Sequence, residues 1–166
     1  SGATLSAGLN KVDVSWQFTQ TELTGLTVTP PVDSDADFTL TVTASARDGS
    51  DTAVVSETLD VTVNAVADAP SLIVSDAGGS EDTAIALDIT SALSDVDGSE
   101  SLSIVISGVP SGATLSAGVN NGDGSWQLTP TELTGLTVTP PVDSEDDFTL
   151  TVTASASDGG DTAVVS

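Results

Sequence analysis

The sequence contains no cysteine, histidine, methionine or tyrosine. Without Cys and His there is no thiolate nucleophile, no imidazole base and no site for a soft metal such as zinc. Positive charge is scarce as well, because only Lys11 and Arg47 oppose 25 Asp and Glu residues, which leaves a net charge of −23. Such a surface repels nucleic acid, whose binding begins with Lys and Arg on phosphates. We therefore expect no enzymatic activity and no nucleic-acid partner.

Long apolar runs are missing too, and no stretch approaches the roughly 20 residues that a membrane-spanning helix needs. We expect no direct membrane insertion. The sequence starts in the middle of a repeat pattern, which suggests a fragment. Few aromatics and a high net charge are typical of disorder, but 38% of the residues are hydrophobic and they alternate with Thr and Ser. That alternation favours a folded β structure.

A long internal repeat organises the chain. Residues 1–56 return at 111–166 with 10 substitutions, so the period is 110 residues. This exceeds the 20 to 50 residues of solenoid units and matches the roughly 100 residues of an immunoglobulin-like domain. We therefore expect independent domains in tandem, each with its own core.

The predicted domain boundary is the connector "NAVADAP" at residues 64–70, in which Pro70 fixes its own φ and makes Ala69 extended. Residues 1–67 are predicted to be the C-terminal part of one repeat. Residues 68–166 are predicted to be a nearly complete second repeat that lacks its last half-strand. That missing half-strand would correspond to "ETLDVTVNA" at 57–65.

Period-2 alternation predicts the strands. In "DFTLTVTASA" (37–46), Phe38, Leu40 and Val42 face one way while Thr and Ser face the other. No segment has a convincing helical period. Turn signals such as "SDGGD", "TPPVDS" and "NNGDG" separate the predicted strands. The predicted fold class is all-β, an immunoglobulin-like or cadherin-like antiparallel β-sandwich. The other predicted strands lie at 57–65, 71–75, 84–89, 101–106, 113–117, 125–129 and 134–139.

Acidic residues gather in the loops, most densely in "DVDGSE" at 95–100. An EF-hand loop would need an oxygen ligand at position 5, Gly at position 6 and Glu at position 12. Counted from Asp95, position 6 is Glu100 and position 12 is Ile106, so the EF-hand pattern fails. Any metal bound here must take its remaining ligands from other loops.

Strand counting predicts which loops meet. We count four strands between 95–100 and 141–147, and two more to the end of the domain, so these loops and the following linker should share one pole. Glu81 and Asp82 should lie at the opposite pole, next to the preceding linker. Each junction between repeats would then gather acidic groups from two repeats and the linker. The candidate metal ligands are Asp33, Asp35, Asp37, Asn64, Asp68, Glu81, Asp82, Asp95, Asp97, Glu100, Asp143, Glu145 and Asp147.

Calcium is the predicted cofactor. Carboxylates about 4 Å apart repel one another by about 1 kcal/mol in water and by more when partly buried, and two basic residues cannot neutralise them. Ca²⁺ accepts six to eight oxygen ligands in irregular geometry. The alternative is that these residues form turns and a solubilising surface. A glycosidase with paired carboxylates would need a sugar cleft, which loops this short do not suggest.

Several motifs in fixed order resemble the tandem extender repeats of giant bacterial RTX-type surface adhesins, a group that includes biofilm and ice-binding adhesins. The motifs are "NAVADAP", "SEDTAIALDI", "SDVDGSESLSI", "SGVPSGATLSAG", "GSWQLTPTELTGLTVTPP" and "DFTLTVTASASDGGDTA". The resemblance implies immunoglobulin-like repeats that are exported by a type I system to the cell surface. It also implies Ca²⁺ bound at and near the junctions, which would rigidify the array and project a ligand-binding tip. The RTX nonapeptide itself is absent from this sequence.

The resulting hypothesis is an extracellular structural spacer whose partners are the neighbouring repeats of the same chain. Two alternatives remain open: a carbohydrate- or protein-binding module that uses Trp16 and Trp126, and a non-adhesive matrix or surface-layer repeat. For the two Trp residues, alternation with Phe18 and Leu128 favours core packing over an exposed platform. Residues 71–110 could complete either copy of the repeat, so strand exchange between chains is a further hypothesis.

Overall fold

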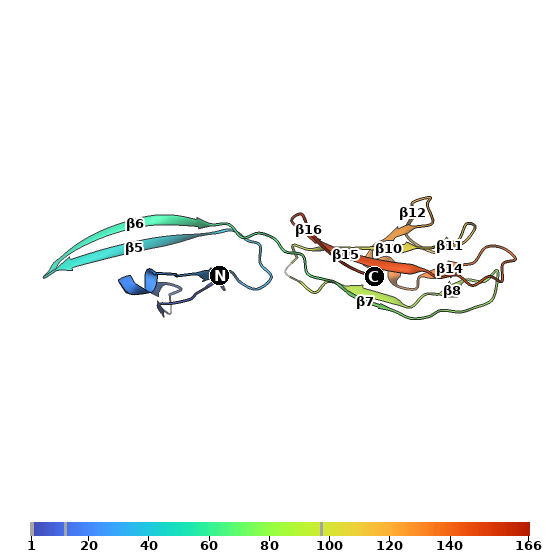
Figure 1. Cartoon of the computed structure of the whole chain (residues 1–166), viewed down its shortest axis with the longest axis horizontal. Coiled ribbons are helices and arrows are strands. Elements are labelled where there is room, and N and C mark those ends of the chain that lie inside the picture. The colour runs from blue at the N-terminus through green and yellow to red at the C-terminus, as the bar shows by residue number, and fades with distance from the viewer. Residues whose placement is uncertain (1, 12, 97) are drawn as a thin grey trace. The chain divides into compact units, whose positions relative to one another are not determined.

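The computed structural model describes residues 2–11, 13–96 and 98–166. The chain divides into two compact units, unit 1 (Ser1–Asn64) and unit 2 (Ala65–Ser166), and both are drawn in Figure 1. The sequence placed the break after residue 67, whereas residues 65–67 belong with unit 2. Within these ranges the paired strands are antiparallel and the helical elements are two four-residue 3-10 turns, so the predicted all-β class and antiparallel pairing are confirmed. Among the described residues, no helix is long and apolar enough to cross a membrane.

Unit 2 consists of three sheets. The largest has the order β12-β13-β10-β15-β16, the second the order β11-β14-β8, and the third pairs β7 with β9. One 3-10 turn, η2 (Pro130–Leu133), precedes β14. The strands are β7 (Ser71–Val74), β8 (Ile85–Ala86), β9 (Ile89–Ala92), β10 (Ser101–Ser107), β11 (Thr114–Leu115), β12 (Val119–Asn120), β13 (Trp126–Leu128), β14 (Thr137–Thr139), β15 (Thr151–Asp158) and β16 (Asp161–Val165).

The centre of unit 2 is the pairing of β10 with β15, which runs from Ser101↔Ser157 to Ser107↔Thr151. Alternation in both strands sends every second side chain inward, so Ile104 and Ile106 of β10 and Ala154 of β15 are fully buried. In this register Ala154 is opposite Ile104 and Ala156 is opposite Leu102, so a small side chain lies beside each of these large ones and the inner face packs closely. This pairing confirms the strand predicted at 101–106.

One hydrophobic core joins the sheets of unit 2. The five-stranded sheet contributes Ile104, Ile106 and Leu128, while Leu115 and Val138 come from β11 and β14. Ile89 of β9 also belongs to this core, and Leu72 of β7 packs against it. The apolar faces of all three sheets are therefore buried against one another. Trp126 also packs against this core, as predicted from its alternation with Leu128.

The segment predicted as one strand at 84–89 is divided between two sheets. Residues 85–86 form β8 and pair with β14, whereas β9 pairs with β7 from Ile89 onward. Leu87 lies at the break and donates its N–H to Leu136 O at 3.0 Å. A single passage of chain thus crosses from one sheet to another, which periodicity alone does not show.

Unit 1 has nearly the same sequence as residues 111–166 but a different degree of burial. Its ladders pair β1 with β4, β2 with β3, and β5 with β6. None of the described side chains of unit 1 is buried; Leu23, the counterpart of the buried Leu133, is 54% exposed. The elements are β1 (Thr4–Leu5), β2 (Leu9–Asn10), β3 (Trp16–Gln17), η1 (Gln20–Leu23), β4 (Val28–Thr29), β5 (Phe38–Asp48) and β6 (Asp51–Val61).

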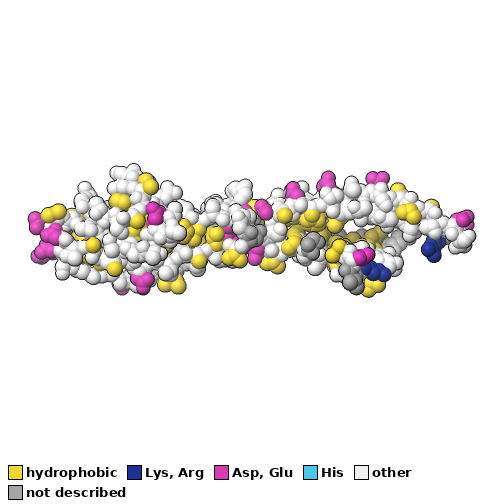
Figure 2. All heavy atoms as spheres, turned by 180° about the vertical axis from the view of Figure 1, so that it is seen from behind, with side chains coloured by type: hydrophobic (Ala, Val, Ile, Leu, Met, Phe, Trp, Pro, Cys, Tyr) yellow, Lys and Arg dark blue, Asp and Glu magenta, His cyan; other side chains and the backbone are white. Residues whose placement is uncertain are grey.

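The difference in burial has a simple cause. In unit 2, β7 to β10 precede the repeated segment and cover its apolar face, and unit 1 contains no counterpart of them. Leu59 and Val55 of β6 are consequently 55% and 59% exposed. Figure 2 shows hydrophobic side chains along a hollow in the face of unit 1, the unit that carries both basic residues.

Candidate metal site

Three carboxylates of unit 2 lie together at the end of the unit where its first residues, the connector, are found. They belong to Asp68, Asp95 and Glu100, and one oxygen from each lies within 4.8 Å of the others. Asp68 lies in the segment before β7, while Asp95 and Glu100 belong to the loop between β9 and β10. Asp95 is 3% exposed, Glu100 is partly buried, and Asp68 is exposed. This cluster could hold a metal ion.

Hydrogen bonds fasten the segment 65–70 to the rest of unit 2 and so bring the three carboxylates together. The Asp68 N–H donates to Glu100 Oε1 at 2.6 Å, and Ser94 Oγ donates to Ala69 O at 2.6 Å. The Ala67 N–H donates to Asp161 Oδ2 at 3.1 Å. The 95–100 loop and the turn between β15 and β16 therefore both hold this segment.

The two carboxylate oxygens of Glu100 have different surroundings. Oε1 accepts the Asp68 N–H, whereas Oε2 is fully enclosed and finds no hydrogen-bond partner among the residues that the structure describes. An enclosed charged oxygen without a partner costs free energy of about 1 to 3 kcal/mol or more. A cation placed between the three carboxylates would remove that cost.

Unit 2 itself contains no group that could supply this positive charge. Both basic residues, Lys11 and Arg47, precede residue 65, so the sequence of 65–166 has neither Lys nor Arg. Neutralising the three carboxylates therefore requires either protons or a cation from solution. The oxygen-only ligand set suits a hard divalent cation and does not suit zinc or copper, which prefer nitrogen and sulfur.

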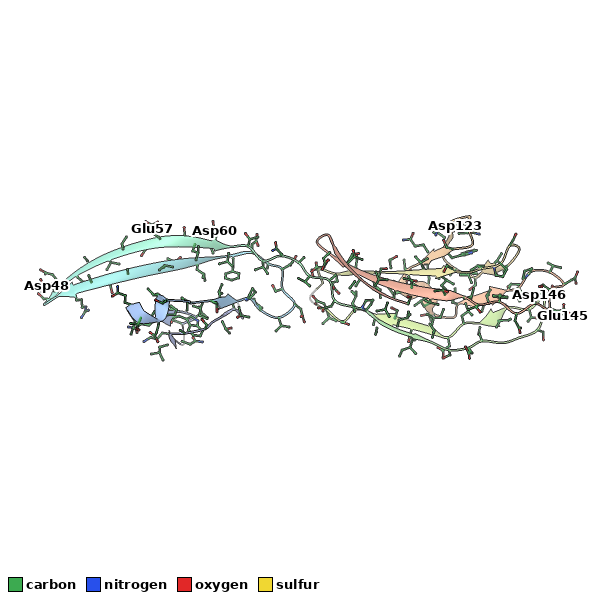
Figure 3. The ribbon with its side chains drawn as sticks, viewed as in Figure 1. Asp48, Glu57, Asp60, Asp123, Glu145 and Asp146 are labelled. Atoms are coloured by element: carbon green, nitrogen blue, oxygen red, sulfur yellow. The ribbon has the colours of Figure 1, made fainter. Side chains whose placement is uncertain are left out.

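The sequence predicted these three residues as ligands, but it placed the surrounding loops at the wrong ends of the unit. The Asp143 N–H donates to Asp82 Oδ1 at 3.0 Å, so loop 141–147 lies beside Asp82, not beside the 95–100 loop. Figure 3 shows Glu145 and Asp146 at the end of unit 2 that lies away from residues 65–68. The preceding connector, with Asp68, thus lies beside Asp95 and Glu100, whereas the sequence had predicted that it lies beside Glu81 and Asp82.

The wrong placement of the 141–147 loop follows from one missed strand. Gly118, at φ 91°, lies between β11 and β12, and β12 pairs antiparallel with β13. The chain between residues 100 and 141 therefore makes five passages, β10 to β14, where the sequence predicted four. An odd number of passages brings the 141–147 loop out at the other end of the unit.

None of the other predicted ligands that the structure describes joins the cluster. Asp97 lies outside the described residues. Glu81, Asp82, Asp143, Glu145 and Asp147 are exposed, and Asp82 and Asp143 adopt left-handed backbone conformations at φ 57° and 56°. The other predicted ligands belong to unit 1, whereas the cluster lies within unit 2: Asp33, Asp35, Asp37 and Asn64.

For one of these residues the structure provides a local role. Asp37 Oδ1 accepts the N–H of Val63 at 2.8 Å, and so holds the chain just beyond the end of β6 against the start of β5. In the second copy of the repeat Asp147 occupies the corresponding position. The acid before the "FTLTV" strand therefore has a backbone partner that does not require a metal.

Sequence reasoning missed two acids near the cluster. Asp158, at the end of β15, is 4% exposed, and its ladder partner Asp161 accepts the Ala67 N–H. Both were interpreted as turn residues of "SDGGD". A correct count of strand passages would have placed this turn beside the connector and identified them.

Comparisons with protein-family models, with curated proteins and with solved structures find no match to this chain.

Proposed function

We propose that the protein is a structural spacer of a bacterial cell-surface adhesin, made of immunoglobulin-like or cadherin-like β-sandwich repeats and stiffened by Ca²⁺. Three features support the proposal: the 110-residue repeat, the separate hydrophobic core of unit 2, and the acidic cluster beside the connector. The extracellular location and the adhesin context rest on the motifs described above. In this role the protein needs no catalytic group.

The single observation that carries the proposal is the arrangement around Glu100. Its Oε2 is enclosed without a hydrogen-bond partner among the described residues, and one oxygen of the Glu100 carboxylate lies within 4.8 Å of oxygens from Asp68 and Asp95. Asp68, Asp95 and Glu100 would be the protein ligands of the ion. Ca²⁺ tolerates irregular sites of six to eight oxygens, whereas Mg²⁺ requires a near-ideal octahedron.

The mechanism follows from where Asp68 lies. Its N–H already donates to Glu100, and an ion shared by its carboxylate would restrain the same residue a second time. The connector would then be held to the 95–100 loop by a hydrogen bond and by metal coordination. A held connector is stiff, whereas a free one behaves as a flexible coil.

Thermal unfolding tests the proposal. For a Kd of about 10⁻⁴ to 10⁻³ M, Ca²⁺ at about 10 mM stabilises the native state by about 1.4 to 2.7 kcal/mol. For a domain of this size the Tm of unit 2 should rise by roughly 5 to 20 °C between chelator and Ca²⁺. Mg²⁺ should give a smaller rise. The measurement is differential scanning calorimetry across a Ca²⁺ titration.

Glu100→Gln is the diagnostic variant, because it keeps the Oε1 that accepts the Asp68 N–H and removes the charge. In chelator its Tm should equal or exceed that of the wild type, since carboxylate repulsion is relieved. In Ca²⁺ most of the rise should be lost. Asp146→Asn, at the other end of unit 2, is the matched control and should keep the full rise. An absent rise in the wild type, or an undiminished rise in Glu100→Gln, would contradict the proposal.

A further inference from the structure

One exposed loop of unit 2 contains a dipeptide that occurs nowhere else in the sequence. Of the four asparagines in the chain, only Asn121 is followed by glycine. Asn121 and Gly122 lie between β12 and β13, and both are exposed. Figure 3 shows this loop, marked by Asp123, projecting from the rest of unit 2. Water therefore reaches both residues.

An Asn–Gly pair can react with itself, because the reacting groups belong to neighbouring residues. The backbone nitrogen of the glycine attacks the side-chain carbonyl carbon of the asparagine, and the bond from that carbon to the side-chain nitrogen breaks. The proton of the attacking nitrogen leaves with the side-chain nitrogen as ammonia. Water then opens the cyclic succinimide at either carbonyl, which yields aspartate or isoaspartate. Water enters and ammonia departs, so the reaction needs neither an oxidant nor a reductant.

The surroundings of Gly122 leave the attacking nitrogen accessible. Gly122 has φ 86°, and a Cβ built there would meet nothing within 4 Å. Its N–H donates to Asn120 Oδ1 at 2.8 Å, which is the side chain of another exposed residue. The β12–β13 ladder itself consists of the pairs Val119↔Gln127 and Asn120↔Trp126. The nitrogen of Gly122 is therefore outside the ladder, and glycine has no side chain to hinder its approach to Asn121.

The first copy of the repeat shows that the loop closes without this dipeptide. At the two positions it has Lys11 and Val12. The same backbone hydrogen bond closes both loops, from the Lys11 N–H to Ser15 O at 2.8 Å and from the Asn121 N–H to Ser125 O at 3.0 Å. In both loops the serine also donates its hydroxyl to the aspartate two residues before it. The Asn–Gly pair thus belongs to the second copy alone, and the first copy provides an internal control.

We propose that Asn121–Gly122 is a site of spontaneous modification, at which the side-chain amide is lost and aspartyl and isoaspartyl forms of the chain accumulate. The reaction uses only the exposed loop and solvent water. It goes beyond the spacer role, because it makes one copy of the repeat change with age while the other copy, which lacks the pair, does not.

The products should loosen the hairpin β12–β13. Asn121 Nδ2 now donates to Ser125 Oγ at 2.9 Å, and Ser125 Oγ donates to Asp123 Oδ1 at 2.6 Å. An aspartate at position 121 loses that donor, and its carboxylate repels the carboxylate of Asp123. In the isoaspartyl form the main chain is longer by a methylene group inside the loop, which disturbs the closing hydrogen bond to Ser125 O.

Peptide mapping of the full chain tests the proposal. The folded protein is incubated in mildly alkaline buffer, where the attacking nitrogen loses its proton more readily. A glutamate-specific protease then releases residues 101–132, because Glu100 and Glu132 bound a segment with no other glutamate. Mass spectrometry should locate at Asn121 the mass gain of OH in place of NH₂, with an isoaspartyl share. The other asparagines should stay unchanged: Asn10, Asn64 and Asn120.

Two variants identify the reacting groups. Asn121→Gln keeps a side-chain amide but lengthens the side chain and so disfavours the ring, and it should show no mass gain. Gly122→Ala adds a Cβ beside the attacking nitrogen and should react at least about tenfold more slowly. Undiminished reaction in either variant, or equal mass gains at Asn120 and Asn121, would overturn the proposal.

Two further outcomes concern the folded state. If Asn121 reacts only after denaturation, the folded loop protects it and the proposal is wrong. In the isoaspartyl fraction, hydrogen exchange at residues 126–128 should be faster than in fresh protein. Equal exchange rates in the two fractions would contradict the expected loosening of the hairpin.

Discussion

Glu100 and Glu132 are two glutamates of unit 2 whose carboxylates are satisfied to different degrees. Glu132 Oε2 accepts both the N–H and the Oγ1 hydroxyl of Thr129, each at 2.7 Å, at the start of η2. Glu100 accepts one backbone N–H through Oε1, and its Oε2 has no partner within the described part of the chain. The same residue type therefore supports a local turn in one place and favours a cation in the other.

Stability should depend on pH through Glu132. The backbone N–H of Thr129 and then its hydroxyl lower the pKa of the Glu132 carboxyl below its ordinary value of 4.5. A group with a lowered folded-state pKa stabilises the fold above its unfolded pKa, and this contribution is lost as the pH falls through the folded pKa. Glu132→Gln should therefore have a lower Tm than the wild type at neutral pH, and the difference should shrink below about pH 4.5.

The control for this prediction is Thr129→Val, which removes the hydroxyl donor and keeps the backbone donor. Its Tm profile against pH, measured by circular dichroism, should lie between those of the wild type and Glu132→Gln. A Tm difference between wild type and Glu132→Gln that stays constant down to strongly acidic pH would show that the hydrogen bonds to Thr129 do not stabilise the charged carboxylate.

At the scale of the elements, the short hairpin β12–β13 depends on Gly118. This residue has φ 91°, and a Cβ placed there would lie 2.8 Å from Leu128 Cγ and 2.9 Å from Gln127 O. Gly118→Ala therefore combines an unfavourable backbone conformation with a clash and should destabilise unit 2 by about 2 to 4 kcal/mol. Urea unfolding monitored by Trp126 fluorescence measures the change.

Gly122 provides the matched control. It lies in the turn of the same hairpin at φ 86°, but a Cβ there would meet nothing within 4 Å. Gly122→Ala should therefore cost only the backbone term, about 1 to 2 kcal/mol. Equal losses of unfolding free energy in Gly118→Ala and Gly122→Ala would mean that Leu128 and Gln127 move away from the new Cβ at no cost.

The long strands could be predicted from the sequence because their alternation is strict. β10 and β15 bury every second residue against one core, so the period of Leu102, Ile104 and Ile106 is visible directly. β8, β9 and β12 could not be delimited in this way, because two to four residues contain no period and a change of sheet leaves no mark in hydrophobicity. Gly118 was the available signal, since a glycine between two apolar stretches can reverse the chain.

The residues of the candidate metal site could be predicted from the sequence, but the way they come together could not. Asp68, Asp95 and Glu100 were among the predicted ligands because acidic residues without basic partners are visible in the sequence. Which acidic loops meet depends on the number of strand passages between them, and one missed passage put the 141–147 loop at the wrong end of the unit. A second acidic pair, Asp82 and Asp143, is joined by a hydrogen bond between two loops that are 61 residues apart in the sequence.

At the scale of the whole molecule, the proposed spacer should become stiffer in Ca²⁺. Because the chain lacks Cys, Glu57→Cys and Glu145→Cys would give one spin label in each unit, at exposed positions that Figure 3 labels. The distribution of distances between the labels, measured by pulsed electron paramagnetic resonance, should be narrower in Ca²⁺ than in chelator. Introducing Glu100→Gln into the labelled chain should abolish the narrowing. Distance distributions of equal width in Ca²⁺ and in chelator would show that Ca²⁺ does not stiffen the chain, and would contradict the spacer role even where the ion binds.

The cluster of Asp68, Asp95 and Glu100 is contained in one unit, and in the proposed tandem array this has a consequence for how the gene could change length. Recombination between nearly identical repeats adds or deletes whole periods. A crossover before the codon of Ala65 transfers all three carboxylates together, so a shortened or lengthened gene inherits complete sites. A crossover between the codons of Asp68 and Asp95 would join halves from two repeats, and those halves still match wherever both repeats keep these acids.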